Sequence, residues 1–166
     1  MTSLCYDSPI GPLLVVEADG HIVEISFMEA DTRQKFRQTE RPLCQPNAAA
    51  VATACIKELE AYFAGKLQTF TVPIKLNGTD FRKRVWEALM AIPYGQTISY
   101  KELAQNIGQP NASRAVGGAN NNNPVSIIVP CHRVIGADGS LVGYGGGLNN
   151  KVFLLEHEKS VHKNLL

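Results

Sequence analysis

The stretch SYKELAQNIGQPNASRAVGGANNN, residues 99–122, carries the local signals that decide the fold of this chain. Ser99 is followed three residues later by Glu102, which is the capping-box pattern that starts an α-helix. Gly108 is typical of a helix end, and a second helix is expected to begin near Pro110–Asn111. Two short helices joined by a turn that contains glycine and proline predict a helix-turn-helix.

Further signals flank this stretch on both sides. Residues 79–92 predict a helix that is capped at its first or second residue and has apolar side chains on one face. After the paired helices, VSIIVP (125–130) predicts a buried strand, ADGS (137–140) a hairpin turn, and residues 149–158 a closing helix. This part of the chain is therefore expected to be mostly helical and winged-helix-like.

The first half of the chain has a different pattern. Three β-forming segments, LCY, LLVVEA and HIVEISF, are separated by the turn signals SPIGP and DG, which predicts a hairpin or meander. Residues 47–64 predict a helix that Asn47 caps and Gly65 ends. Residues 69–76 predict an extended segment.

These patterns predict an α+β fold in two domains. We place the boundary near Asn77–Gly78, so that residues 1–76 form a small N-terminal α/β domain. Residues 77–166 then form the mostly helical C-terminal domain with the helix-turn-helix.

Composition limits the functional classes. The chain has 166 residues, 45% of them hydrophobic, and a net charge of +1, which predicts a soluble globular protein and excludes a strongly basic nucleic-acid-binding domain. It contains no apolar run of about 18 residues and no N-terminal signal segment, so a cytoplasmic protein is expected and no membrane partner. Four cysteines are scattered without close pairs, which favours free thiols and no zinc knuckle: Cys5, Cys44, Cys55 and Cys131.

The string IIVPCHRV, residues 127–134, contains the candidate reactive group. A lone cysteine after an apolar run is usually an inert core thiol, but Cys131 is followed directly by His132 and Arg133, whose side chains can favour a thiolate. Adjacent side chains of an extended chain point to opposite faces, so we expect His132 to act on Cys131 through a water molecule. At this point the thiol is either a core residue or a nucleophile.

The second helix of the pair has an unusual surface. Two glycines inside a helix cost about 1 kcal/mol each relative to alanine, so Gly117 and Gly118 need a reason. The small side chains allow either close helix packing or close approach to a DNA groove, and Arg114 stands alone among them. On the second interpretation the DNA-facing residues are Ala112, Ser113, Ala115, Gly117, Gly118 and Ala119.

Three further features remain to be interpreted. Asn123 either belongs to a polar helix exit or uses its amide to tie neighbouring backbone together beside the site. The glycine-rich LVGYGGGL (141–148) does not match a phosphate-binding motif and is expected to form a flexible wall of a pocket. Glu158, taken alone, is typical of a helix surface.

Together these motifs resemble one family. The string PCHRVIG, with RAVGGANNNNP upstream and GYGGGLNNK and LLEHE downstream, resembles the O6-alkylguanine-DNA alkyltransferases, also called methylated-DNA–protein-cysteine methyltransferases. The resemblance runs through residues 79–158 and includes FRKRVWEAL and IPYGQTISYKELA. The first half resembles the less distinctive first domain of the family.

The resemblance implies a role for each candidate residue. Cys131 would accept an alkyl group from O6 of guanine, helped by a water, His132 and Glu158, and Tyr100 would donate a proton toward the guanine ring. Arg114 would fill the space left by the flipped base, and Asn123 would be the hinge beside the active-site strand. The base pocket would be lined by Val142, Tyr144 and Gly145.

The resemblance also implies a partner and a stoichiometry. The partner would be double-stranded DNA containing O6-alkylguanine, bound through the minor groove with base flipping by a monomer. No cofactor is expected, because the sequence offers no complete ligand set for zinc. Each molecule would repair one lesion, since the thioether product is not hydrolysed. The alternatives are a thiol hydrolase with multiple turnovers and a helix-turn-helix regulator without chemistry.

Overall fold

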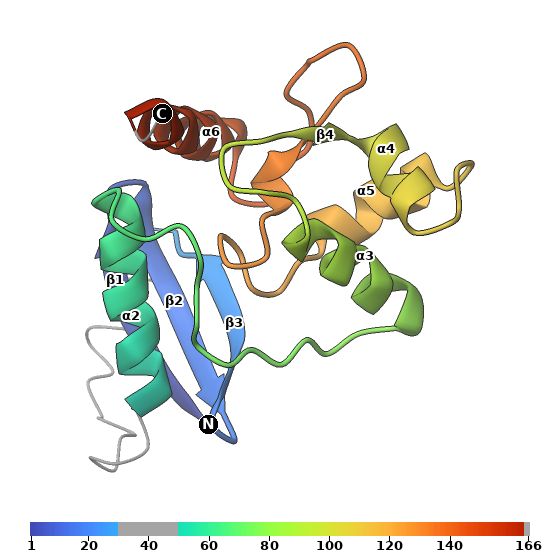
Figure 1. Cartoon of the computed structure of the whole chain (residues 1–166). Coiled ribbons are helices and arrows are strands. Elements are labelled where there is room, and N and C mark those ends of the chain that lie inside the picture. Colours follow the sequence, from blue (N-terminus) through green and yellow to red (C-terminus); the bar gives the residue numbers. More distant parts are fainter. Residues whose placement is uncertain (30–49, 165–166) are drawn as a thin grey trace. The chain divides into compact units, whose positions relative to one another are not determined.

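The computed structural model describes residues 1–29 and 50–164, which form two compact units, Met1–Leu76 and Asn77–Leu166. The first unit contains an antiparallel sheet of three strands in the order β1-β2-β3 (Figure 1). The second unit contains most of the helices. The mixed α+β architecture predicted from the sequence is thus confirmed.

The sheet of the first unit is a meander. Its strands are β1 (Thr2–Ser8), β2 (Gly11–Ala18) and β3 (His21–Phe27). Asp19 and Gly20 join β2 to β3, both with positive φ (50° and 72°), as the tight turn of a two-residue hairpin requires. The DG signal in the sequence therefore marks the hairpin correctly.

Among the described residues of this unit, one helix, α2 (Ala50–Phe63), packs on the sheet. Its buried residues join those of the strands in a core that includes Leu13, Val15, Ile22, Ile25, Cys55, Leu59 and Tyr62. The helix ends at Phe63, and the turn that follows contains Gly65 (φ 71°), the predicted stop, with Lys66 N–H donating to Ala61 O (2.8 Å). The expected cap Asn47 lies outside the described residues. The extended segment 69–76 makes one parallel bridge, between Ile74 and Ile22.

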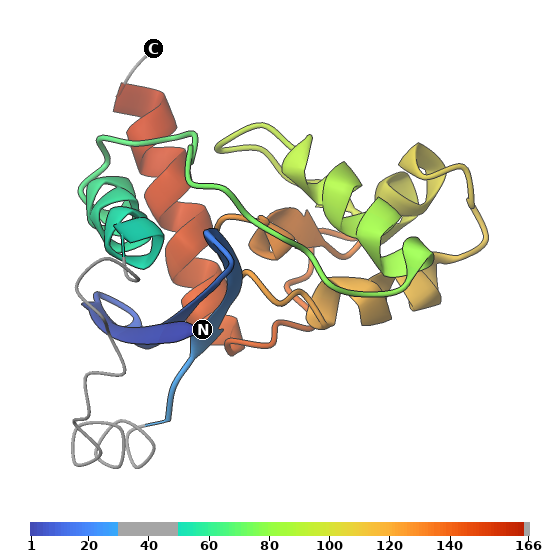
Figure 2. The same cartoon turned by 90° about the horizontal axis from the view of Figure 1, so that it is seen from below.

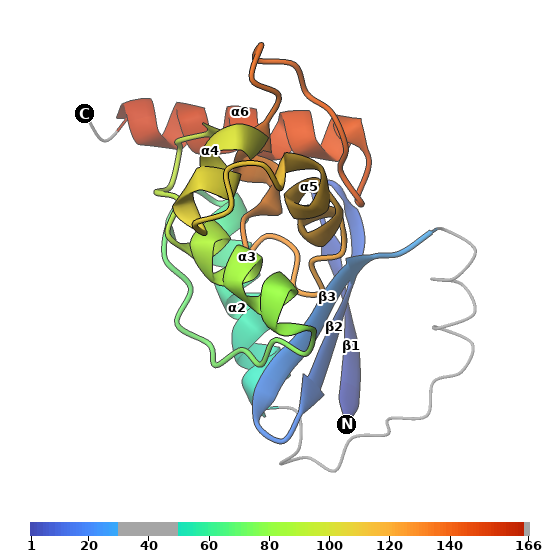
Figure 3. The ribbon, with the colours of Figure 1, turned by 90° about the vertical axis from the view of Figure 1, so that its right-hand side faces the viewer.

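The second unit begins with three helices that pack on one another (Figure 3). Thr79 caps α3 (Asp80–Met90) by accepting a hydrogen bond from Arg82 N–H (3.3 Å). The predicted capping box starts α4 (Tyr100–Asn106): Glu102 N–H donates to Ser99 Oγ (3.1 Å), and Ser99 N–H donates to the Glu102 carboxylate (2.6 Å). The next helix, α5 (Ser113–Asn121), begins later than Pro110–Asn111, because those residues form a turn.

The segment before Cys131 differs from its prediction. Residues 125–130 are buried, apart from the half-buried Ser126 and Ile128, but form no strand: they fold into a tight turn with a bridge between Ser126 and Val129, and Ile127 has φ 74°. A short apolar run indicates burial, but it does not distinguish a strand from a buried turn. Cys131 consequently opens a short 3-10 helix, η1 (Cys131–Arg133), instead of standing at the end of a strand.

The predicted hairpin at residues 137–140 is also wrong. A turn is present, with Gly136 N–H donating to Ser140 O (2.8 Å), but the residues after it form no strand. Instead β5 (Val134–Ile135) pairs in parallel with β4 (Ile98–Ser99). The glycine-rich chain then leads into α6 (Leu148–Asn164), whose whole length is visible in Figure 2 and which packs on η1.

No helix in the described parts of the chain combines the length and apolar character that crossing a membrane requires.

Candidate functional site

Cys131 lies at the start of η1 with only 4% of its surface exposed. Burial raises the pKa of the Cys131 thiol, although a hydrogen bond with Asn123 and the positive charge of Lys151 act to lower it. The resting sulfur is therefore a neutral thiol at neutral pH. A reaction at this sulfur requires a group that takes its proton.

His132 is such a group, and its side chain is fully buried. Its Nε2–H donates to Glu158 Oε1 (2.7 Å), which leaves Nδ1 as the atom with a free lone pair. Burial lowers the pKa of His132, so the ring is neutral at neutral pH. Nδ1 has no hydrogen-bond partner among the described residues, so it is available to accept a proton.

Glu158 is 1% exposed, which corrects the surface interpretation made from the sequence. Arg133 binds it with two hydrogen bonds, from Nε to Oε2 (2.8 Å) and from Nη2 to Oε1 (3.0 Å). Burial alone would raise the pKa of Glu158, but the hydrogen bonds and charges of His132 and Arg133 outweigh it and hold the pKa well below its usual range. The carboxylate is therefore ionised.

Arg133 does not act on the sulfur as its place in the sequence suggested. Its third hydrogen bond goes from Nη1 to Ile92 O (2.7 Å), and its guanidinium lies 5.5 Å from the centre of the Tyr94 ring. The 3-10 backbone turns Arg133 toward α6, so its charge stabilises Glu158 and not a thiolate.

Two tyrosines lie near the thiol. Tyr100 is the first residue of α4, and its hydroxyl donates to Val142 O (2.9 Å). Burial and the negative charge of ionised Cys131 both raise the pKa of Tyr100. Burial, the negative charges of ionised Cys131 and Glu158 and a hydrogen bond with Cys131 raise the pKa of Tyr144 well above its usual range. Both phenols are therefore protonated at neutral pH.

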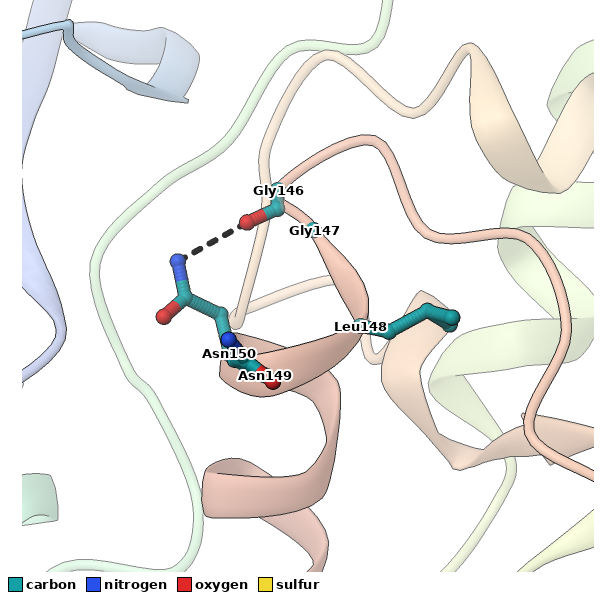
Figure 4. Close-up of a pocket in the computed structure, with 5 residues that line it drawn as sticks. All are labelled: Gly146, Gly147, Leu148, Asn149 and Asn150. Carbon is teal, nitrogen blue, oxygen red and sulfur yellow. Dashed lines mark hydrogen bonds between the residues drawn. The ribbon is translucent and has the colours of Figure 1, made fainter.

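The glycine-rich loop 141–148 is anchored at several points. Val142 is 48% exposed, but its carbonyl oxygen accepts the Tyr100 hydrogen bond. A Cβ added at Gly145 would lie 3.4 Å from Asn121 O, so the loop passes close to the end of α5. Figure 4 shows the end of the loop, where Gly146–Asn150 line a pocket and Asn150 Nδ2 donates to Gly146 O (2.8 Å).

Lys151 is a site residue that the sequence interpretation missed. It is fully buried, and its ammonium group donates to Val134 O (2.6 Å) and Val142 O (3.2 Å). Burial lowers the pKa of Lys151, and the negative charge of ionised Cys131 raises it. The available signal was spacing: Lys151, Leu154 and Glu158 lie three and four residues apart and form the buried stripe of α6.

Asn123 ties the backbone together before the thiol. Its Nδ2 donates to Val129 O (2.8 Å), and its Oδ1 accepts from Val125 N–H (3.0 Å). Both bonds span the turn that precedes Cys131. This confirms the second interpretation of Asn123 and excludes a purely solvated helix exit.

The small residues of α5 divide between two roles. Ala119 is 3% exposed, and its carbonyl oxygen accepts a hydrogen bond from Trp86 Nε1 (2.9 Å), so its assignment to a DNA-facing surface is wrong. A Cβ at Gly117 would lie 3.8 Å from the Tyr100 ring, whereas one at Gly118 would meet open space. The exposed residues of this helix surface include Arg114, Ala115 and Gly118, while Ala112 and Ser113 are half-buried.

The described residues contain no cluster of three or more His, Cys, Asp or Glu side chains that could hold a metal ion.

Two family descriptions match the chain. Residues 2–76 match the ribonuclease-like domain of 6-O-methylguanine DNA methyltransferase, and residues 80–160 match the DNA binding domain of 6-O-methylguanine DNA methyltransferase. The chain belongs to this family. The resemblance found in the sequence is thereby confirmed.

Similar proteins agree with this assignment to the 6-O-methylguanine DNA methyltransferase family. A methylated-DNA–protein-cysteine methyltransferase of Mycobacterium leprae is 49% identical over 153 residues, covering 92% of this chain and 89% of the relative. One of Methanosarcina acetivorans is 48% identical over 155 residues, covering 93% and 96%. The crystal structure of Mycobacterium tuberculosis OGT in complex with DNA has a TM-score of 0.81 and 50% identity, covering 95% of this chain and 92% of that one.

In this family member the structure brings most of the predicted site residues together. Cys131, His132 and Glu158 form one buried group, and Tyr100, Val142 and Tyr144 lie around it through the contacts described above. Arg114 stays apart as an exposed residue of α5. The sequence interpretation missed Lys151, Asn120 and the clamp that Arg133 forms on Glu158.

Proposed function

We propose that this chain repairs DNA by moving an alkyl group from O6 of guanine to the sulfur of Cys131. The observation that carries the proposal is a buried thiol followed directly by a buried imidazole whose Nδ1 has no partner among the described residues. Burial raises the pKa of Cys131 and lowers that of His132, which favours the neutral form of both groups. The other ring nitrogen is bound to an ionised carboxylate. This arrangement supports removal of a proton from sulfur at the moment of reaction.

The proposed step is an in-line displacement at the alkyl carbon. The thiol proton passes through a water to His132 Nδ1, and the imidazolium that forms is stabilised by Glu158. The sulfur electron pair forms the S–C bond while the O6–C bond breaks, and its electrons move into the guanine ring. Tyr100 donates a proton to the ring, so that the leaving group is a neutral guanine still joined to the DNA, and the imidazolium proton then passes through water to the Tyr100 phenolate. The thioether is not hydrolysed, so each molecule acts once.

The DNA-binding element in this proposal is the pair α4 and α5. We assign residues 107–112 as the turn of a helix-turn-helix and α5 as the helix that enters the minor groove of double-stranded DNA. Ala115 and Gly118 support this role because they leave the surface of α5 without bulky side chains. Arg114 would occupy the gap left by the flipped nucleotide.

Several accompanying properties belong to the same proposal. The C-terminal unit carries both DNA binding and the acceptor thiol, and a monomer acts in the cytoplasm without a cofactor. The free thiols of Cys55 and Cys131 are consistent with a reducing compartment.

The test is mass spectrometry after incubation with a duplex that contains one O6-methylguanine. We expect one added methyl group per protein molecule, on the peptide containing Cys131, and none in Cys131→Ser. Methyl on Cys55 or continued turnover would contradict the proposal. Hydrolysis of esters with turnover would indicate the thiol hydrolase, and sequence-specific binding that Cys131→Ser retains, without transfer by the wild type, would indicate the regulator.

A further inference from the structure

Asn120 presents an unpaired acceptor beside the reactive cysteine. It lies in the last turn of α5 with 1% of its surface exposed, and its Nδ2 donates to the carbonyl oxygen of Cys131 (3.3 Å). This bond determines the orientation of the amide, so the remaining atom, Oδ1, is an acceptor. Oδ1 is buried and has no hydrogen-bond partner among the described residues. A buried acceptor without a donor is costly and calls for an explanation.

Asn120 lies near the two groups that border the proposed base pocket, Tyr100 and the glycine-rich loop. The next residue, Asn121, lies against the glycine-rich loop: a Cβ added at Gly143 would be 3.3 Å from its Nδ2. Tyr100 contacts the same helix, because a Cβ at Gly117 would be 3.8 Å from its ring. The end of α5 thus meets the Cys131 backbone, Tyr100 and the loop. A hydrogen bond with Tyr100 places the Asn120 side chain among these groups.

The chemistry of the two possible lesions indicates which donor can pair with this oxygen. Alkylation at O6 removes the proton from N1 of guanine, so the exocyclic amino group at C2 is the remaining N–H donor of the base. An O4-alkylated thymine has lost its N3 proton and has no N–H donor. A buried acceptor therefore distinguishes the two bases, because only guanine can satisfy it.

We propose that Asn120 Oδ1 accepts a hydrogen bond from the exocyclic amino group of the flipped O6-alkylguanine and makes Asn120 a specificity-determining residue. This inference rests on the proposed function. It assigns the reading of the base to a side chain of α5. Arg114 of the same helix has a separate role, in the duplex.

The experiment removes the two partners of this bond separately. Rates of methyl transfer to Cys131 are measured under single-turnover conditions with O6-methylguanine and with O6-methylhypoxanthine, which lacks the amino group, in the same duplex. The proteins are wild type, Asn120→Leu and Asn120→Ala, with Asn122→Ala as a control for loss of an exposed asparagine at the end of α5. Any difference in the cost of base flipping between the substrates cancels when the rate ratios of two proteins are compared.

We expect the wild type to prefer O6-methylguanine, and Asn120→Leu to reduce that preference by about tenfold, the effect of leaving one buried acceptor unpaired. Asn122→Ala should keep the wild-type ratio. The same ratio in wild type and in Asn120→Leu would overturn the inference and would assign Oδ1 to an ordered water. If Asn120→Leu does not fold, Asn120→Ala supplies the same comparison. Absence of methyl on Cys131 in the wild type with both substrates would instead contradict the proposed function.

Discussion

Arg133 illustrates how one side chain sets the charge of its neighbours. Its two hydrogen bonds hold the Glu158 carboxylate in an ionised form inside the protein, although burial alone would favour the neutral acid. Glu158 in turn fixes the tautomer of His132 and leaves Nδ1 free of a proton. The proposed general base, His132, therefore depends on a residue that does not touch the thiol.

The first prediction concerns Glu158→Gln. Removing one partner of a buried ion pair leaves the Arg133 charge uncompensated, so we expect a loss of about 3 kcal/mol in the free energy of unfolding at pH 7. Urea denaturation measures this loss. Glu156→Gln, on the exposed surface of α6, is the control and should change stability little.

The pH dependence of this effect has a defined sign. The pKa of Glu158 is lower in the folded state, so its stabilisation is complete above the unfolded pKa of about 4.5 and is lost as the pH falls toward the folded pKa. The pKa of His132 is also lowered by burial, so stability falls further once the pH drops below about 6.5. The gap between wild type and Glu158→Gln should narrow below pH 4.5, and a gap that stays constant down to pH 3 would contradict this account.

The second prediction concerns Lys151→Met. Methionine fills a similar volume but cannot donate to Val134 O and Val142 O, so we expect a loss of about 2 kcal/mol in unfolding free energy. The change also removes a positive charge that lowers the pKa of Cys131. The thiol should therefore react more slowly with iodoacetamide at pH 8. Lys159→Met, on the exposed surface of the same helix, should alter neither quantity.

At the scale of elements, α5 combines packing and exposure within nine residues. Its buried residues Val116, Ala119 and Asn120 join it to the interior of the unit, and the Trp86 hydrogen bond ties it to α3. The opposite surface carries Ala115 and Gly118 without obstruction. A helix with two such sides can be held rigidly and still approach a ligand closely.

The third prediction uses Gly118→Ala to test the exposed side of α5 without disturbing its packed side. A Cβ at this position meets open space and the backbone is helical, so we expect a gain of about 0.5–1 kcal/mol in unfolding free energy. If α5 enters the DNA groove, the same methyl group should weaken binding to a duplex. Fluorescence anisotropy with a labelled duplex measures the affinity. Ser160→Ala on the exposed surface of α6 is the control, and unchanged affinity in Gly118→Ala would exclude Gly118 from the interface.

At the scale of the whole molecule, the reaction product must fit where the thiol was. Cys131 is 4% exposed and lies in a group of buried polar side chains, so an added methyl group has little free volume. Overpacking of this kind costs about 1–3 kcal/mol. The protein methylated at Cys131 is therefore expected to be less stable than the unreacted protein.

The fourth prediction follows directly. After complete methylation we expect the thermal midpoint to fall by about 2–4 °C for each kcal/mol lost, as in other chains of this size. Differential scanning calorimetry before and after reaction measures the change. Protein incubated with an undamaged duplex and Cys131→Ser incubated with the damaged duplex should both keep their original midpoint. A midpoint that is unchanged or raised would show that the pocket accommodates the methyl group.

Local sequence determined the caps and turns of this protein, in which hydrogen bonds join residues only a few positions apart. The capping box of Ser99 and Glu102, the Asp19–Gly20 turn and the helix stop at Gly65 were all predictable, because each depends on one residue's conformational preference or on a side chain near its own backbone. Several motifs in order over residues 79–158, with PCHRV among them, were together sufficient to indicate the family. Sequence favoured a polar helix exit at Asn123 and offered the amide tie only as the alternative.

Tertiary structure alone decided the chemistry of the site. Burial of an apolar run was readable, but its folding into a turn and a 3-10 helix was not, because both conformations satisfy the same hydrophobic pattern. The bond between His132 and Glu158 joins residues far apart in the chain, as does that between Asn120 and the Cys131 carbonyl. Such pairs form only when separate helices pack, and the same packing removes water and sets the charges of Glu158 and Lys151.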